Sequence, residues 1–308
     1  MTAPIAAPGA QYLDPAVLAR ISSLELRARA VVEGFIQGLH RAPHLGSSTD
    51  FAEHRPYVPG DDLRRMDWRL YARTDRYYVK EFEADTNTNL MVFLDVSRSM
   101  LYGSKLSYAC TLAACLAYFS SLQRDRVGLA TFANGTVDFV PPSAKHLRMV
   151  LHSLDRAPQT VPTAPAKPAR LRDMFKRFSD IVRRRSMIAI ISDFYEEPED
   201  VVDAVNELRG RGNDLMVLQV LEPSERDFPF TESSNFVDLE SDDKMPIIPE
   251  YLRDDYQRLI TDHIATLDRR LTGQGVDFAH FDTRQPMDKA LFRYLAARSR
   301  FERARMVG

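Results

Sequence analysis

The chain has 308 residues, of which 44% are hydrophobic and 27% are charged, as is typical of a globular protein with one large domain or two small ones. A formal net charge of −2 gives no electrostatic basis for binding nucleic acid or an anionic membrane. The longest apolar stretch is shorter than the ~18 residues that a membrane-spanning helix needs, and residues 1–10 lack the pattern of a signal peptide. We therefore expect a cytoplasmic protein with no membrane span and no nucleic-acid partner.

The N-terminal part, residues 1–45, is predicted to be a short tail followed by one amphipathic helix. Asp14 and Pro15 form a helix start, with a capping carboxylate and a proline in the first turn. Apolar residues then recur at steps of three and four from Val17 to Leu39, which indicates one apolar stripe on a helix of about 25 residues. This stripe either docks on the rest of the chain or packs against a helix of a partner.

Residues 46–88 are rich in proline, glycine, aspartate, arginine and aromatic residues and show weak periodicity. This composition predicts a loop-rich segment that packs on the sheet through Trp68 and neighbouring tyrosines, with a short edge strand at 77–82. Between Gly60 and Asp85, six basic residues are outnumbered by seven acidic ones, so we interpret the segment as salt-bridged rather than as a nucleic-acid patch.

From residue 89 to 308, short apolar runs alternate with helical patterns, which predicts an α/β fold with a mostly parallel sheet and helices on both faces. Asn134-Gly135 is a strong hairpin signal, so the flanking strands should be antiparallel and form one edge. Ser143 is expected to cap the next helix, and residues 156–168 should form an exposed connection. The expected strands are 90–94, 127–132, 136–140, 187–191, 214–221, 236–239 and 276–281; the expected helices are 105–122, 143–154, 171–185, 198–209, 249–271 and 286–300.

Two cysteines, Cys110 and Cys115, lie in one apolar helical stretch. Five residues along a helix correspond to a rotation of roughly 140°, so the two thiols face different directions. A disulfide between them is not expected, and two buried thiols are typical of a reducing compartment.

Polar side chains directly follow two of the expected strands. Asp95, Ser97 and Ser99 come after 90–94, and Asp193 comes after 187–191. The carboxyl ends of parallel strands meet at one edge of a sheet, so the two carboxylates share a crevice if their strands are neighbours. Carboxylate and hydroxyl oxygens are hard donors that suit Mg²⁺ or Mn²⁺. Alternatively, Asp95 and the serines only cap the turn that follows the strand.

The stretch Asp95-Val-Ser97-Arg-Ser99 resembles the Asp-x-Ser-x-Ser motif of von Willebrand factor A domains, and Asp193 matches that family's later strand-end aspartate. The resemblance implies a metal-ion-dependent adhesion site, in which a cation held by these four residues binds a carboxylate of a partner. Such a site normally also uses a threonine just before the helix that precedes the second aspartate's strand. The corresponding position lies near Ala169 and has no hydroxyl, so binding of Mg²⁺ or Mn²⁺ is expected to be weak or absent.

A longer resemblance covers the loop-rich segment. Phe51-Ala-Glu-His-Arg-Pro-Tyr57-Val-Pro-Gly60-Asp-Asp-Leu-Arg-Arg-Met-Asp67-Trp68, followed by Tyr71-Ala-Arg-Thr-Asp75, is similar to the signature of the domain-of-unknown-function 58 family. That resemblance implies a von Willebrand factor A-like domain over 89–308 and the company of MoxR-type AAA+ ATPases. It also implies an adaptor role in the assembly or maturation of other proteins.

The leading hypothesis is therefore a non-enzymatic interaction module with a MoxR-type AAA+ ATPase and a client protein as partners. The alternative is a metal-dependent hydrolase or phosphotransferase that uses Asp95 and Asp193. Ser97 stands where aspartyl phosphatases have a second aspartate, and the chain has neither a Walker loop nor a G-x-S-x-G elbow. A purely structural scaffold without metal is the third possibility.

Overall fold

The computed structural model describes residues 23–41, 54–56, 71, 77–80, 88–133, 135–163, 171–182 and 185–288. The chain divides into two compact units, one made of residues 1–38 and 88–308 and the other of residues 39–87.

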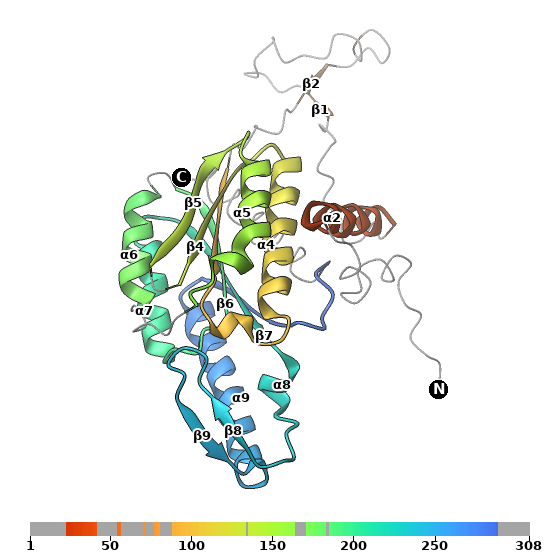
Figure 1. Ribbon diagram of the computed structural model, residues 1–308. Helices are drawn as coiled ribbons and strands as arrows, with labels where there is room; N and C mark the ends of the chain where they lie inside the picture. The colour runs from red at the N-terminus through yellow and green to blue at the C-terminus, as the bar shows by residue number, and fades with distance from the viewer. Residues whose placement is uncertain are drawn as a thin grey trace. The chain divides into compact units, whose positions relative to one another are not determined.

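The larger unit contains a six-stranded sheet, shown in Figure 1. Its strands coincide with the short apolar runs of the sequence, because helices cover both faces and each central strand must be apolar on both sides. In chain order they are β3 (Asn89–Asp95), β4 (Arg126–Phe132), β5 (Thr136–Ser143), β6 (Met187–Ser192), β7 (Asp214–Leu221) and β10 (Asp277–Asp282).

The strand order is β10-β7-β6-β3-β4-β5, and every neighbouring pair is parallel except β4 and β5, which are antiparallel. The chain moves outward from β3 through β4 and β5 and then returns to the other side of β3 with β6. The order therefore reverses between β3 and β6, and in such sheets ligands bind at the carboxyl ends of the two strands that flank the reversal. The prediction of an α/β fold with a mostly parallel sheet and one antiparallel edge strand is confirmed.

The helices cover both faces of the sheet. Figure 1 shows α4 and α5 on one side and α6 and α7 on the other. Within the described residues of the larger unit, the helices are α2 (Leu24–Arg41), the 3₁₀ helix η3 (Ser99–Leu101), α4 (Lys105–Leu122), α5 (Leu147–Thr160), α6 (Leu171–Ile181), α7 (Pro198–Arg209), α8 (Pro223–Asp227) and α9 (Pro249–Gly273). The last three residues of α2 belong to the smaller unit.

The core on the α6 side is built from aromatic residues. Met91 and Phe93 are two positions apart on β3, so their side chains lie on the same face of the sheet. On that face they belong to one buried cluster with side chains of α6, α7 and α9. Phe93 lies 4.5 Å from Phe178 of α6 between ring centroids, and Phe132 of β4 meets Phe175 edge to face at 5.7 Å. This packing fixes the position of β3, which carries the first part of the site described below.

The apolar stripe of α2 docks within the chain. Leu24, Ala28, Val31, Val32 and Phe35 are buried. The ring of Phe35 contacts Phe119 of α4 edge to face, with 5.8 Å between the centroids. Of the two alternatives for this helix, docking in cis is confirmed for its described residues, while its expected start at Asp14 lies outside them.

The opposite face of the sheet is covered by α4, whose small side chains allow close packing. Its alanines at 109, 113, 114 and 117 are fully buried. Cys110 and Cys115 are both free and buried in the same helix. Burial raises the pKa of the Cys110 thiol to about 12, so this thiol stays protonated and unreactive.

The smaller unit contains a two-stranded antiparallel ladder of β1 (His54–Pro56) and β2 (Tyr78–Lys80). The expected strand at 77–82 is thus present in shorter form. Trp68 and most of the family signature lie outside the described residues, and the packing of this segment on the sheet stays a prediction.

Two expectations for the middle of the chain are wrong. Ser143 does not cap a helix, because β5 continues through Pro141 and Pro142 to pair Ser143 with Val127, and α5 begins later, at Leu147. Prolines are tolerated here because β5 is an edge strand, whose outward N–H groups need no partner. The helix also extends to Thr160 with Pro158 inside it, which shortens the expected connection.

The expected strand at 236–239 does not join the sheet. Instead, β8 (Ser234–Val237) pairs with β9 (Lys244–Ile247) in a separate antiparallel hairpin. The pattern failed here because both strands are largely exposed and β9 contains a proline, so neither shows the apolar alternation of a sheet strand.

Gly128 of β4 provides a test of how closely the antiparallel edge packs. A Cβ at this position would overlap the sulfur of Met91 and lie 2.8 Å from the carbonyl oxygen of Val140. We expect Gly128→Val to lower the free energy of unfolding by about 1–3 kcal/mol, measured by urea denaturation, because the core must shift to admit the side chain. Gly273→Ala is the matched control, since its Cβ would meet no atom within 4 Å and should leave stability unchanged or slightly raised. Equal effects of the two substitutions would contradict this packing.

Candidate functional site

Asp95 ends the central strand β3 and is almost fully buried, with 6% of its surface exposed. Its Oδ1 accepts a hydrogen bond from the backbone N–H of Ser97 at 2.8 Å, and its Oδ2 accepts one from the hydroxyl of Ser192 at 2.5 Å. One carboxylate oxygen therefore caps the turn that follows β3, which is the predicted alternative to binding a metal. The other oxygen ties β3 to β6.

Ser97 and Ser99 place their hydroxyl oxygens 3.0 Å apart at the same strand end. Both residues are partly exposed, whereas Asp95 behind them is not. The two hydroxyls thus form the accessible part of the cluster, and the carboxylate forms its floor.

Asp193 follows β6, the direct neighbour of β3, so the structure places it at the same edge of the sheet as Asp95. Asp193 is 4% exposed, and its backbone carbonyl accepts a hydrogen bond from Gln219 of β7 at 2.9 Å. The next residue, Phe194, has a left-handed backbone with φ of 50°, a costly conformation for a residue with a side chain. Strained backbone of this kind is concentrated at functional sites. We name the four predicted residues Asp95, Ser97, Ser99 and Asp193 the rim.

The side chain that sequence reasoning missed is Lys105, the first residue of α4. It is fully buried, and its Nζ donates to Oδ2 of Asp193 at 2.9 Å and to Oε1 of Glu225 at 2.6 Å. The ammonium also lies over the ring of Tyr195, 5.2 Å from its centroid. Burial lowers the pKa of Lys105, but the charges of Asp193 and Glu225 outweigh it and raise the pKa overall, so the lysine stays charged.

The sequence did contain a signal for Lys105. A cation in the first turn of a helix opposes the helix dipole, and the rest of 105–122 has no charged residue. Such a residue requires compensating carboxylates nearby if it is buried. The pattern of α8 gave no comparable indication of Glu225.

The short helix α8 holds Lys105 in place. Glu222 and Glu225 form a capping box, in which the backbone N–H of Glu222 donates to Oε2 of Glu225 at 2.7 Å. Glu222 in turn accepts a 2.6 Å hydrogen bond from the hydroxyl of Ser104. The loop after β7 is thereby fastened to the start of α4, directly beside the rim.

The acidity of Asp95 reflects this environment. Burial is the largest influence and raises its pKa, the negative charge of Asp193 adds to it, and hydrogen bonds from Ser192 and Ser97 lower it. The resulting pKa is about 7, so Asp95 changes its protonation state near neutral pH.

A divalent cation fits this arrangement only in part. Asp95, Ser97 and Ser99 offer hard oxygen atoms on one turn, as Mg²⁺ or Mn²⁺ requires. Asp193 does not fit, because its carboxylate is already neutralised by Lys105. The described part of the chain holds no group of three or more histidine, cysteine, aspartate or glutamate side chains suited to a metal. Thr160, which lies upstream of the expected threonine position near Ala169, donates its hydroxyl to the carbonyl of Ala157 at the end of α5.

The tip of the β8–β9 hairpin also reaches the rim, which the sequence did not predict. Oε1 of Glu240 accepts a hydrogen bond from the backbone N–H of Ser99 at 2.7 Å. Oδ1 of Asp242 accepts one from the guanidinium of Arg98 at 2.6 Å. A carboxylate of the chain itself therefore lies against the serines.

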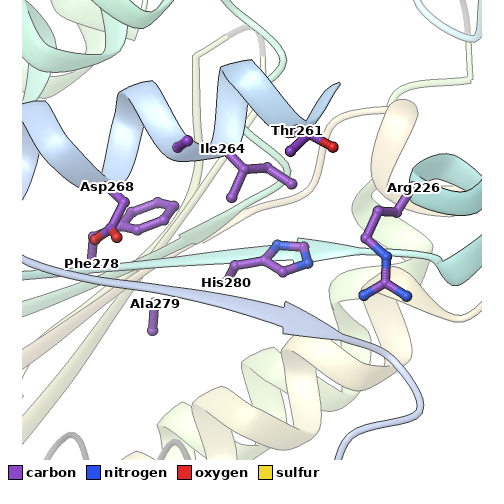
Figure 2. Close-up of a pocket in the computed structure, with 8 residues that line it drawn as sticks. Arg226, Thr261, Ile264, Asp268, Phe278, Ala279 and His280 are labelled. Carbon is purple, nitrogen blue, oxygen red and sulfur yellow. The ribbon is translucent and has the colours of Figure 1, made fainter. Parts of the chain in front are cut away.

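A separate pocket of about 390 Å³ lies between α9 and the edge strand β10. Figure 2 shows the ring of His280 pointing into it, with Ile264 above and Arg226 to one side. Burial is the main influence that lowers the pKa of His280, and the charge of Arg226 adds to it. Among the described residues neither ring nitrogen has a hydrogen-bond partner. None of the rim residues lines this pocket, so it is distinct from the predicted site.

Comparison with known proteins identifies the family. Residues 53–266 match the family described as "Protein of unknown function DUF58". The chain belongs to the DUF58 family. An uncharacterised protein of Mycobacterium bovis is 30% identical to this DUF58 chain over 300 residues, which cover 93% of the chain and 91% of that protein. Uncharacterised proteins of two Mycobacterium tuberculosis strains match equally well.

Two solved structures are similar to this DUF58 protein at low identity. BatB from Bacteroides thetaiotaomicron is 16% identical, with 69% of this chain and 99% of that chain covered and a TM-score of 0.45. An aerotolerance-related membrane protein from Bacteroides fragilis is 17% identical, with 66% and 96% covered and a TM-score of 0.45. In the described part of the DUF58 chain, the helices are all too short or too polar to cross a bilayer.

Proposed function

We propose that this DUF58 protein is a non-enzymatic interaction module whose rim binds a carboxylate-bearing partner, and that it acts with a MoxR-type AAA+ ATPase in the assembly or maturation of other proteins. The choice of ATPase rests on the sequence resemblance of the family signature. The choice of binding surface rests on the geometry of the rim.

The single observation that supports the rim as a binding surface is its place in the sheet. Its residues end β3 and β6, the two strands between which the strand order reverses. Ligands of open α/β sheets bind in the crevice at this position. The fold thus gathers side chains from the ends of two strands, which are close in space and far apart in sequence, at one edge of the sheet.

The groups that a partner would meet there are donors. The carboxylates of Asp95 and Asp193 are buried and already hydrogen-bonded, while the partly exposed groups are the hydroxyls of Ser97 and Ser99 and the guanidinium of Arg98. A carboxylate accepts hydrogen bonds from all of these, and charge-assisted bonds of this type are the stronger ones. An acidic partner therefore suits the surface better than a basic one.

A metal has a subordinate place in this proposal. Asp95, Ser97 and Ser99 are the residues that would hold Mg²⁺ or Mn²⁺, and such an ion would supply an additional positive charge for the partner's carboxylate. Arg98 already supplies one partly exposed positive charge beside the serines. We accordingly propose that partner binding persists, at least in part, in the presence of a chelator.

The alternative of a hydrolase or phosphotransferase has less support. Catalysis by Asp193 as a nucleophile or base requires a free carboxylate, whereas Lys105 holds this one from inside the fold. Asp95 is likewise engaged by two hydrogen bonds.

Removal of the Asp95 carboxylate tests the proposed function. We expect Asp95→Ala to reduce binding of the purified MoxR-type ATPase from the same organism by at least tenfold, measured by biolayer interferometry with and without EDTA, because the turn bearing both serines loses its cap. Asp254→Ala, which removes an exposed carboxylate of α9, is the matched control and should bind normally. Circular dichroism verifies that both variants fold. Equal binding by the two variants would refute the role of the rim.

A further inference from the structure

The β8–β9 hairpin reaches the rim from the connection between β7 and α9. The two strands pair with each other and with no strand of the six-stranded sheet. Residues 238–243 connect them and form the tip. Through Glu240 and Asp242, this tip contacts Ser99 and Arg98 of the Asp-x-Ser-x-Ser stretch. The guanidinium of Arg98 is one of the donors that the proposed function assigns to a partner, and the N–H of Ser99 belongs to the same residue as another of them.

The conformation of the tip is stabilised by bonds that do not involve the side chains of Glu240 and Asp242. Oδ1 of Asp238 accepts hydrogen bonds from the backbone N–H groups of Glu240 and Ser241, at 2.7 and 3.2 Å. The backbone N–H of Asp242 donates to the carbonyl of Asp238 at 2.9 Å. The side chains of Glu240 and Asp242 take no part in these bonds. They are therefore presented outward, two residues apart, for contact with the rim.

The hairpin is held at two places, through Phe236 of β8 and at its tip. Phe236 packs on Phe228 and Phe230 with ring centroids 5.8 and 5.1 Å apart. Its cross-strand partner Met245 and the neighbouring Val237 are 65% and 45% exposed. The ion pair at the tip is partly accessible to water, with side-chain exposures of 17% for Arg98 and 49% for Asp242. Ion pairs that water reaches are weak, so the tip can leave the rim while Phe236 stays packed.

From these contacts we infer that the hairpin tip is a tethered occupant of the rim, and that the partner carries an acidic segment that replaces it. The inference rests on the proposed function for the existence of such a partner. The partner's segment presents one carboxylate to the N–H of Ser99 and a second, two residues later, to Arg98. Because the tip is covalently attached, it competes at high effective concentration and lowers the apparent affinity of the partner.

The test measures binding of a defined peptide to the 308-residue chain. The probe is a fluorescently labelled synthetic peptide of residues 234–247, and the host is the double variant Glu240→Ala/Asp242→Ala, in which the tip can no longer occupy the rim. We expect the double variant to bind the peptide at least tenfold more tightly than the unaltered chain in fluorescence anisotropy. A peptide with Gln at 240 and Asn at 242 is the control and should not bind. Hydrogen exchange at the Ser99 amide should also be faster in the double variant.

Each outcome decides the inference. Tighter binding of the acidic peptide together with faster exchange at Ser99 supports it. Equal or absent peptide binding by both chains, or an unchanged rate at Ser99, overturns it. The measurement needs no ATPase, so a failure of the proposed function is separate: it would appear as equal ATPase binding by Asp95→Ala and Asp254→Ala, whatever the peptide does.

Discussion

Replacement of Lys105 by methionine is expected to lower the free energy of unfolding by about 3–5 kcal/mol, because it leaves the buried carboxylate of Asp193 and the partly buried one of Glu225 without their cation. Lys105 is fully buried and contacts both Asp193 and Glu225. Methionine has a similar volume, so the loss comes from charge rather than from a cavity. Urea denaturation followed by circular dichroism measures the effect.

Lys176→Met is the matched control for this prediction. Lys176 is exposed on α6, and the same substitution there should change stability by less than about 0.5 kcal/mol. The double variant Lys105→Met/Asp193→Asn should recover part of the loss, since it also removes one of the two uncompensated charges. If Lys105→Met is as stable as the control, the lysine is not the counter-charge of the rim.

A stability that depends on pH through Asp95 is the second large effect that we expect. The pKa of Asp95 is raised from 3.8 to about 7, so the folded chain holds this proton more tightly than the unfolded chain does. The stabilisation by the protonated form is fully present below about pH 4 and is lost as the pH rises through about 7. At 1.36 kcal/mol per pKa unit, the complete loss is about 4 kcal/mol.

Asp95→Asn isolates this contribution, because asparagine keeps the shape and cannot titrate. The stability of the asparagine variant relative to the unaltered chain should increase by up to about 4 kcal/mol between about pH 4 and pH 8. Denaturation at a series of pH values in EDTA measures the difference, and EDTA removes any cation that would compensate Asp95. Asp254→Asn is the control and should show a difference that does not vary with pH. A relative stability of Asp95→Asn that falls with rising pH would show that the buried carboxylate is stabilised by its surroundings.

The sequence predicted the sheet well because its strands are short apolar runs, and burial on both faces requires that composition. The same argument placed Asp95 and Asp193 at the same edge, since parallel strands align their carboxyl ends. The antiparallel edge followed from Asn134-Gly135, because this dipeptide strongly favours the tight turn of a β-hairpin. These features depend on periodicity and on turn chemistry, both of which are local.

The parts that failed depend on contacts between distant residues. Lys105 and Glu225 are 120 positions apart, and no local pattern indicates which carboxylate the ammonium meets. The hairpin at 234–247 was missed because exposed strands have no apolar alternation. The same absence hid Glu240, which meets Ser99 across 141 positions. The sequence therefore predicted the hydroxyls and aspartates of the candidate site. It predicted neither Lys105, which balances the charge of Asp193, nor the hairpin tip that contacts the rim.

The hairpin has a consequence for the divergence of related proteins. It lies within the connection between β7 and β10 and shares no ladder with the sheet. Loops in such positions accept changes in length and sequence at small cost to stability. Relatives can therefore alter the acidic tip, and with it the choice of binding partner, while the sheet and its buried lysine stay the same.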